Sequence, residues 1–279
     1  DTKEMTESDV IQNMVGREIT NLFPKRNASL KETVLAIEDL SVNLGSESTI
    51  SLKDINFDLH KGEVLGIGGL MGAGRSELLM HIFCSRGTRK SGEIRFKNEN
   101  LLNNTAGESI ECGLIMVTED RKKLGLILEE SIAFNLSLSH LKNFIKGGLL
   151  DSHSEMLENR KYFESLRVKA PSLQSAVGGL SGGNQQKVVL GKALMTLPDV
   201  IFLDEPTRGI DIGAKAEIYE LINELTKEGK AVILVSSELP ELLGMSDRIL
   251  MLSAGRQAEI IDKKDATEEN LLRAAMKYS

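Results

Sequence analysis

The chain has 279 residues, of which 41% are hydrophobic and 27% charged, and its formal net charge is −7. This length suffices for one substantial core, or for one α/β domain that carries a smaller subdomain. Basic residues are interspersed with acidic residues along the sequence instead of forming a basic stripe, which argues against nucleic acid as a partner, and the longest apolar runs are too short to span a membrane.

The first 32 residues predict a helix followed by a linker. Apolar residues recur at helical spacing through residues 8–23, and Pro24 with the polar residues after it ends the pattern. We therefore expect the segment 1–32 to precede the main domain, which spans residues 33–263.

Residues 33–120 predict the first part of the domain core. Alternating apolar residues at 50–60 indicate a half-exposed strand, which we expect to pair antiparallel with a strand just before it. An apolar run at 64–70 then leads through a glycine-rich turn to a helix. The residues expected on the buried face of that helix are Leu78, Leu79, Ile82 and Phe83.

The rest of the domain consists of a helical stretch and the second part of the core. Residues 121–192 read mainly as helix and are interpreted as a helical subdomain inserted into the sheet domain. In residues 193–263, buried strands are expected at 199–206 and 231–235, separated by a helix that stops at Gly229. This alternation predicts the α/β class, with a mostly parallel sheet covered on both faces.

The end of the chain is predicted to form a hairpin and a terminal helix. The hairpin covers residues 248–262, and the helix lies within residues 264–279. Asp265 and Glu268 have the spacing of a capping box at the start of this helix.

The stretch GIGGLMGAGRS, residues 66–76, has the spacing of a phosphate-binding loop. Glycines in such a loop let successive backbone N–H groups and a helix N-terminus converge on an anion. The motif has Arg75 in the place of the usual lysine. Taken alone, the glycines are also compatible with a tight turn between a strand and a helix. The candidate phosphate-binding residues are Gly69, Gly72, Gly74, Arg75 and Ser76.

Two acidic residues end the predicted strand VIFLDEP. In open α/β sheets ligands bind at the carboxyl ends of the strands, where Asp204 and Glu205 are expected. Asp204 suits a magnesium site and Glu205 suits a general base that activates water. A solvated turn with two acidic residues would look the same in the sequence.

A second candidate anion-binding segment is LSGGNQ, Leu180–Gln185. It places the hydroxyl of Ser181 and the glycines Gly182 and Gly183 at the start of a predicted helix. Asn184 and Gln185 continue the segment.

The order of these three motifs, followed by TRGID, resembles the nucleotide-binding domain of ATP-binding cassette (ABC) transporters. The resemblance covers about residues 33–260 and is closest to the second, C-terminal cassette of the fused ATPase subunits of monosaccharide importers of the ribose, galactose, xylose and arabinose type. It implies a P-loop NTPase (RecA-like) fold that has antiparallel strands near its N-terminus. It also implies that residues 1–32 are the tail of a preceding cassette.

The resemblance assigns roles to individual residues, with ATP and Mg²⁺ as ligands. Ser76 and Asp204 would hold Mg²⁺, Arg75 would stand where a lysine grips the phosphates, and Glu205 would be the general base. The segment from Leu180 to Gln185 would act on the ATP of a partner cassette. Asp211 would lie in the loop that communicates between the two ATP sites.

The resemblance also implies partners and a location. A second cassette would form a head-to-tail dimer with this one, and the helical subdomain would contact the permease subunits in the membrane. A sugar-binding protein would act indirectly through the permease. The chain would thus lie peripherally at the cytoplasmic face of the cell membrane.

Four positions depart from the family pattern. Arg75 carries a planar, forked guanidinium where the usual lysine carries a compact ammonium. Glu119 stands where most cassettes have a glutamine that contacts the metal, and Ser237 stands where most have a histidine that contacts the γ-phosphate. The segment LSVNL, residues 40–44, offers no aromatic ring to stack on adenine.

All four departures affect the site of this cassette's own phosphate loop, whereas the partner-facing motifs match the family apart from Asn184. We therefore expect this half to hold ATP weakly or to hydrolyse it slowly, and to complete the ATP site of its partner. Glu205 is retained, so some turnover stays compatible with the sequence. The alternatives are a non-hydrolysing cassette that only dimerises and regulates, and a soluble ABC ATPase of translation or DNA repair.

Other residues are interpreted as structural. Cys84 and Cys112 lie in apolar segments without metal-ligand spacing, so we expect both thiols to be buried. Lys187 is expected on the surface of its helix. The charged run at 119–123 is compatible with a coupling loop and with a solvated loop.

Overall fold

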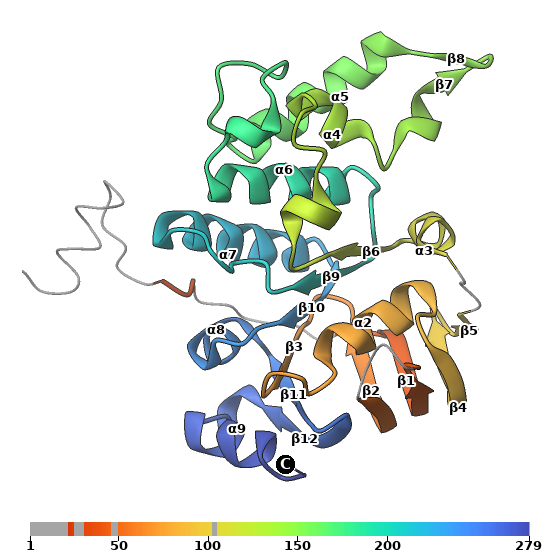
Figure 1. Ribbon diagram of the computed structural model, residues 1–279, viewed down its shortest axis with the longest axis vertical. Coiled ribbons are helices and arrows are strands. Elements are labelled where there is room, and N and C mark those ends of the chain that lie inside the picture. The colour runs from red at the N-terminus through yellow and green to blue at the C-terminus, as the bar shows by residue number, and fades with distance from the viewer. Residues whose placement is uncertain (1–21, 25–30, 46–49, 102–104, 279) are drawn as a thin grey trace, which may run out of the picture.

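One mixed sheet organises the molecule, as Figure 1 shows for the computed structural model, which describes residues 22–24, 31–45, 50–101 and 105–278. The sheet has ten strands in the order β5-β4-β1-β2-β12-β11-β3-β10-β9-β6. The strands are β1 (Thr33–Asn43), β2 (Ser51–His60), β3 (Val64–Gly69), β4 (Thr88–Phe96), β5 (Glu99–Asn100), β6 (Leu114–Val117), β9 (Val200–Asp204), β10 (Ala231–Val235), β11 (Arg248–Ser253) and β12 (Arg256–Asp262).

The parallel part of the sheet consists of β6, β9, β10, β3 and β11, each parallel to its neighbours within this group. Every residue of β9 and β10 is buried, as expected for strands covered on both faces. Side chains alternate between the two faces: Phe202 and Ile233 join one apolar cluster, and Leu203 and Leu234 join another. The predicted α/β class is confirmed.

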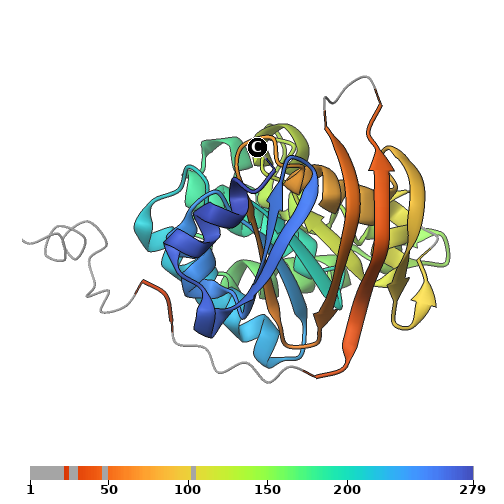
Figure 2. The same ribbon diagram turned by 90° about the horizontal axis from the view of Figure 1, so that it is seen from below.

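The antiparallel part lies beside β11. β1 pairs antiparallel with β2, as predicted, and also with β4, which the sequence analysis did not identify. β11 and β12 form the predicted antiparallel hairpin. Seen from below in Figure 2, β1 and β2 lie on one side of the molecule and the terminal helix on the other.

Helices cover the sheet. The longer ones are α2 (Arg75–Cys84), α5 (Ser152–Ser165), α6 (Gly182–Leu194), α7 (Ile212–Lys227) and α9 (Glu268–Ala275). The shorter ones are α3 (Ala106–Cys112), α4 (Ile132–Ser137) and α8 (Leu239–Met245), with single turns at η1 (Arg121–Gly125), η2 (Leu141–Phe144), η3 (Val177–Gly179) and η4 (Lys263–Asp265). In the described residues no helix has both the length and the hydropathy needed to cross a bilayer.

The segment between β6 and β9 is mainly helical, as predicted, and in Figure 1 it lies beyond α7. It contains α4, α5 and α6, and also a small hairpin of β7 (Ile145–Lys146) and β8 (Leu149–Leu150) that the sequence analysis missed. Apolar side chains of α4 and α6, among them Leu136 and Val188, share one cluster with Ile218 and Ile222 of α7.

Two local predictions are wrong. The terminal helix begins at Glu268 and is capped by Thr267, whose side chain accepts a hydrogen bond from the Asn270 N–H, so Asp265 and Glu268 form no capping box. Cys112, at the end of α3, is exposed, and Cys84 is only partly buried. The helix predicted at 8–23 lies outside the described residues apart from Leu22 and Phe23, which pack against the core.

Candidate functional site

The loop between β3 and α2 curls as a phosphate-binding loop requires. Gly69 has φ 152°, Gly72 has φ 77° and Gly74 has φ 95°. A Cβ atom on Gly69 would lie 2.5 Å from the Leu252 carbonyl oxygen, and one on Gly74 would lie 2.8 Å from a methyl group of Leu52. Larger residues therefore cannot replace these glycines without displacing their neighbours.

Asp204 and Ser76 meet at the carboxyl edge of the parallel strands. Asp204 ends β9 and is 2% exposed. Burial and the neighbouring Glu205 raise the pKa of Asp204 to about 6, while the Ser76 hydrogen bond and the charge of Arg75 oppose the rise. Its Oδ1 atom is buried without a hydrogen-bond partner. An unpaired carboxylate oxygen next to a hydroxyl suits an oxygen-seeking cation, so these residues fit Mg²⁺.

Glu205, the residue after Asp204, is held by two neighbouring side chains. Its backbone has φ 50°, and its N–H donates to the carbonyl oxygen of Val235 at 3.0 Å. Oε1 lies 3.4 Å from Nη1 of Arg75, and Oε2 accepts a hydrogen bond of 3.1 Å from Ser237. Arg75 and Ser237, two of the four departures from the family pattern, therefore contact the same carboxylate.

Arg75 points toward the end of β10. Its Nη1 atom donates to the carbonyl oxygen of Ser236 at 2.8 Å in addition to pairing with Glu205. The guanidinium thus already has anionic and carbonyl acceptors inside the protein. Arg75 and Glu205 are both largely buried, so this contact is weakly screened by water.

Glu119, at the position where most cassettes have a glutamine that contacts the metal, contacts the loop that follows the acid pair. Its carboxylate accepts from Nη1 of Arg208, which lies between Glu205 and Asp211. Arg121 donates to the carbonyl oxygen of Arg208 at 3.1 Å. The loop after β6 is therefore joined to the loop that follows the acid pair.

The segment Leu180–Gln185 begins helix α6. Ser181 precedes the helix, and its hydroxyl accepts from the Asn184 amide at 2.9 Å. The oxygen of the same amide accepts from the Lys169 N–H at 2.8 Å. A Cβ atom on Gly182 would lie 2.8 Å from Arg121 Nη2, so the glycine lets the guanidinium approach the helix start.

Asp211 begins helix α7 and lies close to the same segment. Its carboxylate accepts from the Ala214 N–H at 3.0 Å and so caps the helix. A Cβ atom on Gly183 would lie 2.5 Å from the Cβ of Ala214. The structure thus brings Asp211 together with Ser181, Gly182 and Gly183, whereas Arg75, Ser76, Asp204, Glu205 and Ser237 form a separate cluster.

These two clusters can be compared with known proteins. The family model described as "ABC transporter" matches residues 52–208. The chain belongs to this family. The cassette is 46% identical over 277 residues to the galactose/methyl galactoside import ATP-binding protein MglA of Pasteurella multocida (strain Pm70), a match that covers 99% of this chain and 54% of the relative.

A second relative is the ribose import ATP-binding protein RbsA of Lactococcus lactis subsp. cremoris (strain SK11). It is 44% identical over 274 residues, which cover 98% of this chain and 54% of the relative. The cassette therefore spans about half the length of both curated relatives.

Solved structures share the fold. An ATP-binding cassette of an ABC transporter in its ADP conformation superposes with a TM-score of 0.69 at 22% identity, covering 88% of this chain and 95% of that chain. The protein cbiO1 of Clostridium perfringens, part of the ABC transporter complex cbiONQ, superposes with a TM-score of 0.71 at 23% identity, covering 87% of this chain and 93% of that chain. The P-loop NTPase fold expected from the sequence is therefore confirmed.

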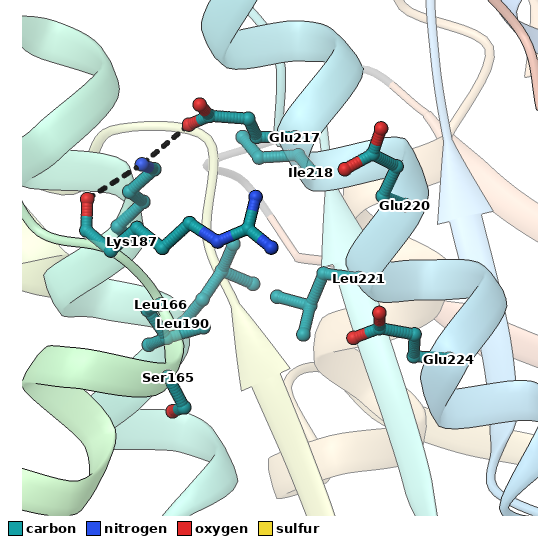
Figure 3. Close-up of a pocket in the computed structure, with 10 residues that line it drawn as sticks. Ser165, Leu166, Lys187, Leu190, Glu217, Ile218, Glu220, Leu221 and Glu224 are labelled. Atoms are coloured by element: carbon teal, nitrogen blue, oxygen red, sulfur yellow. Dashed lines mark hydrogen bonds and ion pairs between the residues drawn. The ribbon is translucent and has the colours of Figure 1, made fainter.

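Lys187 was predicted on the helix surface, and that prediction is wrong. The residue is only 5% exposed, and its Nζ atom lies 2.5 Å from Oε2 of Glu217 on α7 and 3.0 Å from the carbonyl oxygen of Arg167 (Figure 3). The sequence contained one sign that Lys187 does not face solvent. Lys187 is four residues after Gly183 and so lies on the same face of the helix as that glycine.

Sequence reasoning also missed Arg208, Arg121 and Ser236. Each contributes to a contact between loops that are far apart in the chain, so neither the motif TRGID, which contains Arg208, nor the charged run 119–123, which contains Arg121, revealed these contacts. Only the fold brings them to the carboxyl edge of the sheet.

Proposed function

We propose that this chain is the degenerate half of a cassette pair that energises the import of a monosaccharide. In this proposal its own phosphate loop is impaired, and its segment Leu180–Gln185 completes the ATP site of a second cassette. The observation that carries the proposal is the engagement of Glu205 by both Arg75 and Ser237. A base whose carboxylate is paired with an arginine is a poor acceptor for a proton from water.

The substrate class comes from the relatives. Their names specify import of galactose or methyl galactoside and of ribose, and the identities of 46% and 44% extend over nearly the whole chain. Because the chain spans about half of each relative, a second cassette, in the same polypeptide or in another, is the partner that the proposal requires.

The cassette's own residues still shape a nucleotide site. The loop from Gly69 to Gly74 would direct backbone N–H groups at phosphate oxygens, and Ser76 with the unpaired Oδ1 of Asp204 would hold Mg²⁺. When bound, Mg²⁺ neutralises phosphate charge. Arg75 would have to leave Glu205 and Ser236 to reach the phosphates, which makes ATP binding weaker than with a free lysine.

The residues that would face the partner retain the groups that its ATP site requires. Ser181, Gly182 and Gly183 stand at the N-terminus of α6, where the helix dipole and free N–H groups favour a phosphate. Asp211 lies next to them at the start of α7. A second cassette would dock on this face, and permease subunits would contact the helical segment 121–192, with a sugar-binding protein acting through the permease. The chain would then lie peripherally at the cytoplasmic face of the membrane.

The experiment uses the complete two-cassette ATPase assembled with its permease. Ser181→Arg introduces a bulky side chain on the partner-facing segment and should lower ATP hydrolysis and sugar transport by on the order of 100-fold. Glu205→Gln should lower both less than about twofold, because its site contributes little turnover. Ser91→Arg, an exposed serine of β4 outside both this segment and the segment 121–192, is the matched control and should leave both activities unchanged.

Comparable losses from Ser181→Arg and Glu205→Gln would contradict the asymmetric assignment. A regulatory cassette without hydrolysis predicts no loss at all for Glu205→Gln together with full loss for Ser181→Arg. An isolated chain that hydrolyses ATP rapidly would contradict the impaired site.

A further inference from the structure

Helices α6 and α7 run side by side with their N-termini at the same end. Near that end, a Cβ atom on Gly183 would lie 2.5 Å from the Cβ of Ala214. One turn further along, Lys187 meets Glu217. Leu190 and Leu221 then line the same cavity between the helices. The two helices therefore keep a matched register over at least two turns, and Ser181 and Asp211 stand just before their respective first turns.

The ammonium of Lys187 joins three segments. It lies 2.5 Å from the Glu217 carboxylate of α7 and 3.0 Å from the carbonyl oxygen of Arg167, which follows the end of α5. Figure 3 shows both contacts, with Lys187 and Glu217 reaching toward each other across the gap between the helices. Arg167 has φ 51°, so the chain turns at the residue whose carbonyl Lys187 holds.

A groove between the helices opens to solvent beside this ammonium. A cavity of about 60 Å³ lies beside it between α5, α6 and α7, with Leu190 and Leu221 on its apolar side and Glu220 and Glu224 on its acidic side. Glu220 and Glu224 are exposed, so this cavity opens to solvent, whereas Val188 of α6 and Ile218 of α7 pack in one apolar cluster. Beside this apolar packing, the ion pair is a directional contact that fixes the register of α6 on α7 beyond Gly183.

We propose that Lys187 is a positioning residue for the partner's ATP site. By holding α6 against α7 it fixes Ser181, Gly182 and Gly183 relative to Asp211, so that both partner-facing segments reach the nucleotide together. This inference rests on the proposed function, in which these segments act on the ATP of a second cassette. Lys187 does not itself contact that nucleotide.

The test is steady-state ATP hydrolysis by the complete two-cassette transporter. Lys187→Met keeps the length of the side chain but removes the charge, and it should lower kcat by on the order of tenfold with KM for ATP unchanged within twofold. KM should not move, because the partner's phosphate loop binds the nucleotide. Lys187→Arg, which keeps a cation, should retain most of the wild-type kcat.

A double-mutant cycle shows whether the pair acts as a unit. Because the two side chains act through one contact, adding Glu217→Gln to Lys187→Met should lower kcat no further. Additive losses would overturn the proposal. If Lys187→Met does not fold, Glu217→Gln alone should still lower kcat at constant KM.

The matched control is Tyr162→Phe, which removes a hydrogen bond of 3.1 Å from the Tyr162 hydroxyl to the Leu194 carbonyl at the other end of α6. It should lower the melting temperature but leave kcat unchanged. Equal kcat losses for Tyr162→Phe and Lys187→Met would show general destabilisation and overturn the proposal. An unchanged kcat in Lys187→Met, together with strong loss in Ser181→Arg, would overturn this proposal alone, whereas full activity in Ser181→Arg would overturn the proposed function.

Discussion

At the scale of single residues, Arg75 shows how one substitution can redirect a conserved type of loop. A guanidinium presents donors in a planar fork, so it can bond the Ser236 carbonyl while it lies near Glu205. A lysine ammonium in the same place is a compact charge on a flexible stem and is not committed to a fork geometry. We propose that the cation at this position therefore binds Glu205 and the Ser236 carbonyl instead of a phosphate.

Arg75→Lys should strengthen ATP binding by this cassette. We expect the dissociation constant for ATP to fall on the order of tenfold, equivalent to about 1.4 kcal/mol, because the ammonium can turn from Glu205 toward the phosphates. Titration of a fluorescent ATP analogue measures the change. Turnover should stay low, because Ser237 still stands where the family has histidine.

Arg86→Lys, an exposed position just after α2, is the matched control and should leave ATP binding unchanged. Unchanged or weaker ATP binding by Arg75→Lys would mean that the guanidinium does not compete with the nucleotide.

The sequence predicted the acid pair and the glycine loop because both depend on local spacing. It could not predict that Arg75 bonds Ser236, because these residues are 161 positions apart. Lys187 was misplaced for a similar reason: a lysine in a polar run looks exposed until α7 supplies Glu217 and α5 supplies a carbonyl. Buried charges are retained only with partners, and the partners come from tertiary structure.

At the scale of secondary structure, strongly patterned elements were predictable and weakly patterned ones were not. β9 and β10 are short apolar runs that follow turn residues, and both were found. β4 was missed because its residues Thr88–Phe96 are mostly polar and largely exposed. Helix ends depend on single side chains, which explains the error at Thr267.

Two glycines inside helices offer a matched pair of substitutions. In α3, the nearest atom to a Cβ on Gly107 would be 3.9 Å away, so Gly107→Ala should raise the free energy of unfolding by up to about 0.5–1 kcal/mol. In α6, a Cβ on Gly191 would lie 2.6 Å from a methyl group of Leu136, so Gly191→Ala should lower it by about 1–3 kcal/mol.

Urea denaturation of both variants and the parent measures the two changes, and each variant is the control for the other. Stabilisation by both substitutions would show that Leu136 and its neighbours yield without cost, and that α6 is not tightly packed at Gly191.

At the scale of the whole molecule, the two candidate sites lie at the ends of secondary-structure elements that are far apart in the sequence. The carboxyl ends of β3, β9 and β10 carry the candidate residues of the cassette's own site, and the N-termini of α6 and α7 carry the residues that we propose face a partner. Residues at the start of the described chain also pack against helix α7. Phe23 packs on Tyr219 with ring centroids 5.3 Å apart, and the Pro24 carbonyl accepts from Asn223 at 3.3 Å.

Phe23→Ala should therefore destabilise the domain as a whole, although residue 23 precedes its first strand. The ring also packs against α8, since a Cβ on Gly244 would lie 2.3 Å from it. Its removal should lower the free energy of unfolding by about 1–3 kcal/mol, since Phe23 is only partly buried. The control is Phe134→Ala, a ring that is 39% exposed and should cost less. If both substitutions cost the same, the residues before β1 contribute nothing specific to the support of α7 and α8, and the domain effectively begins at β1.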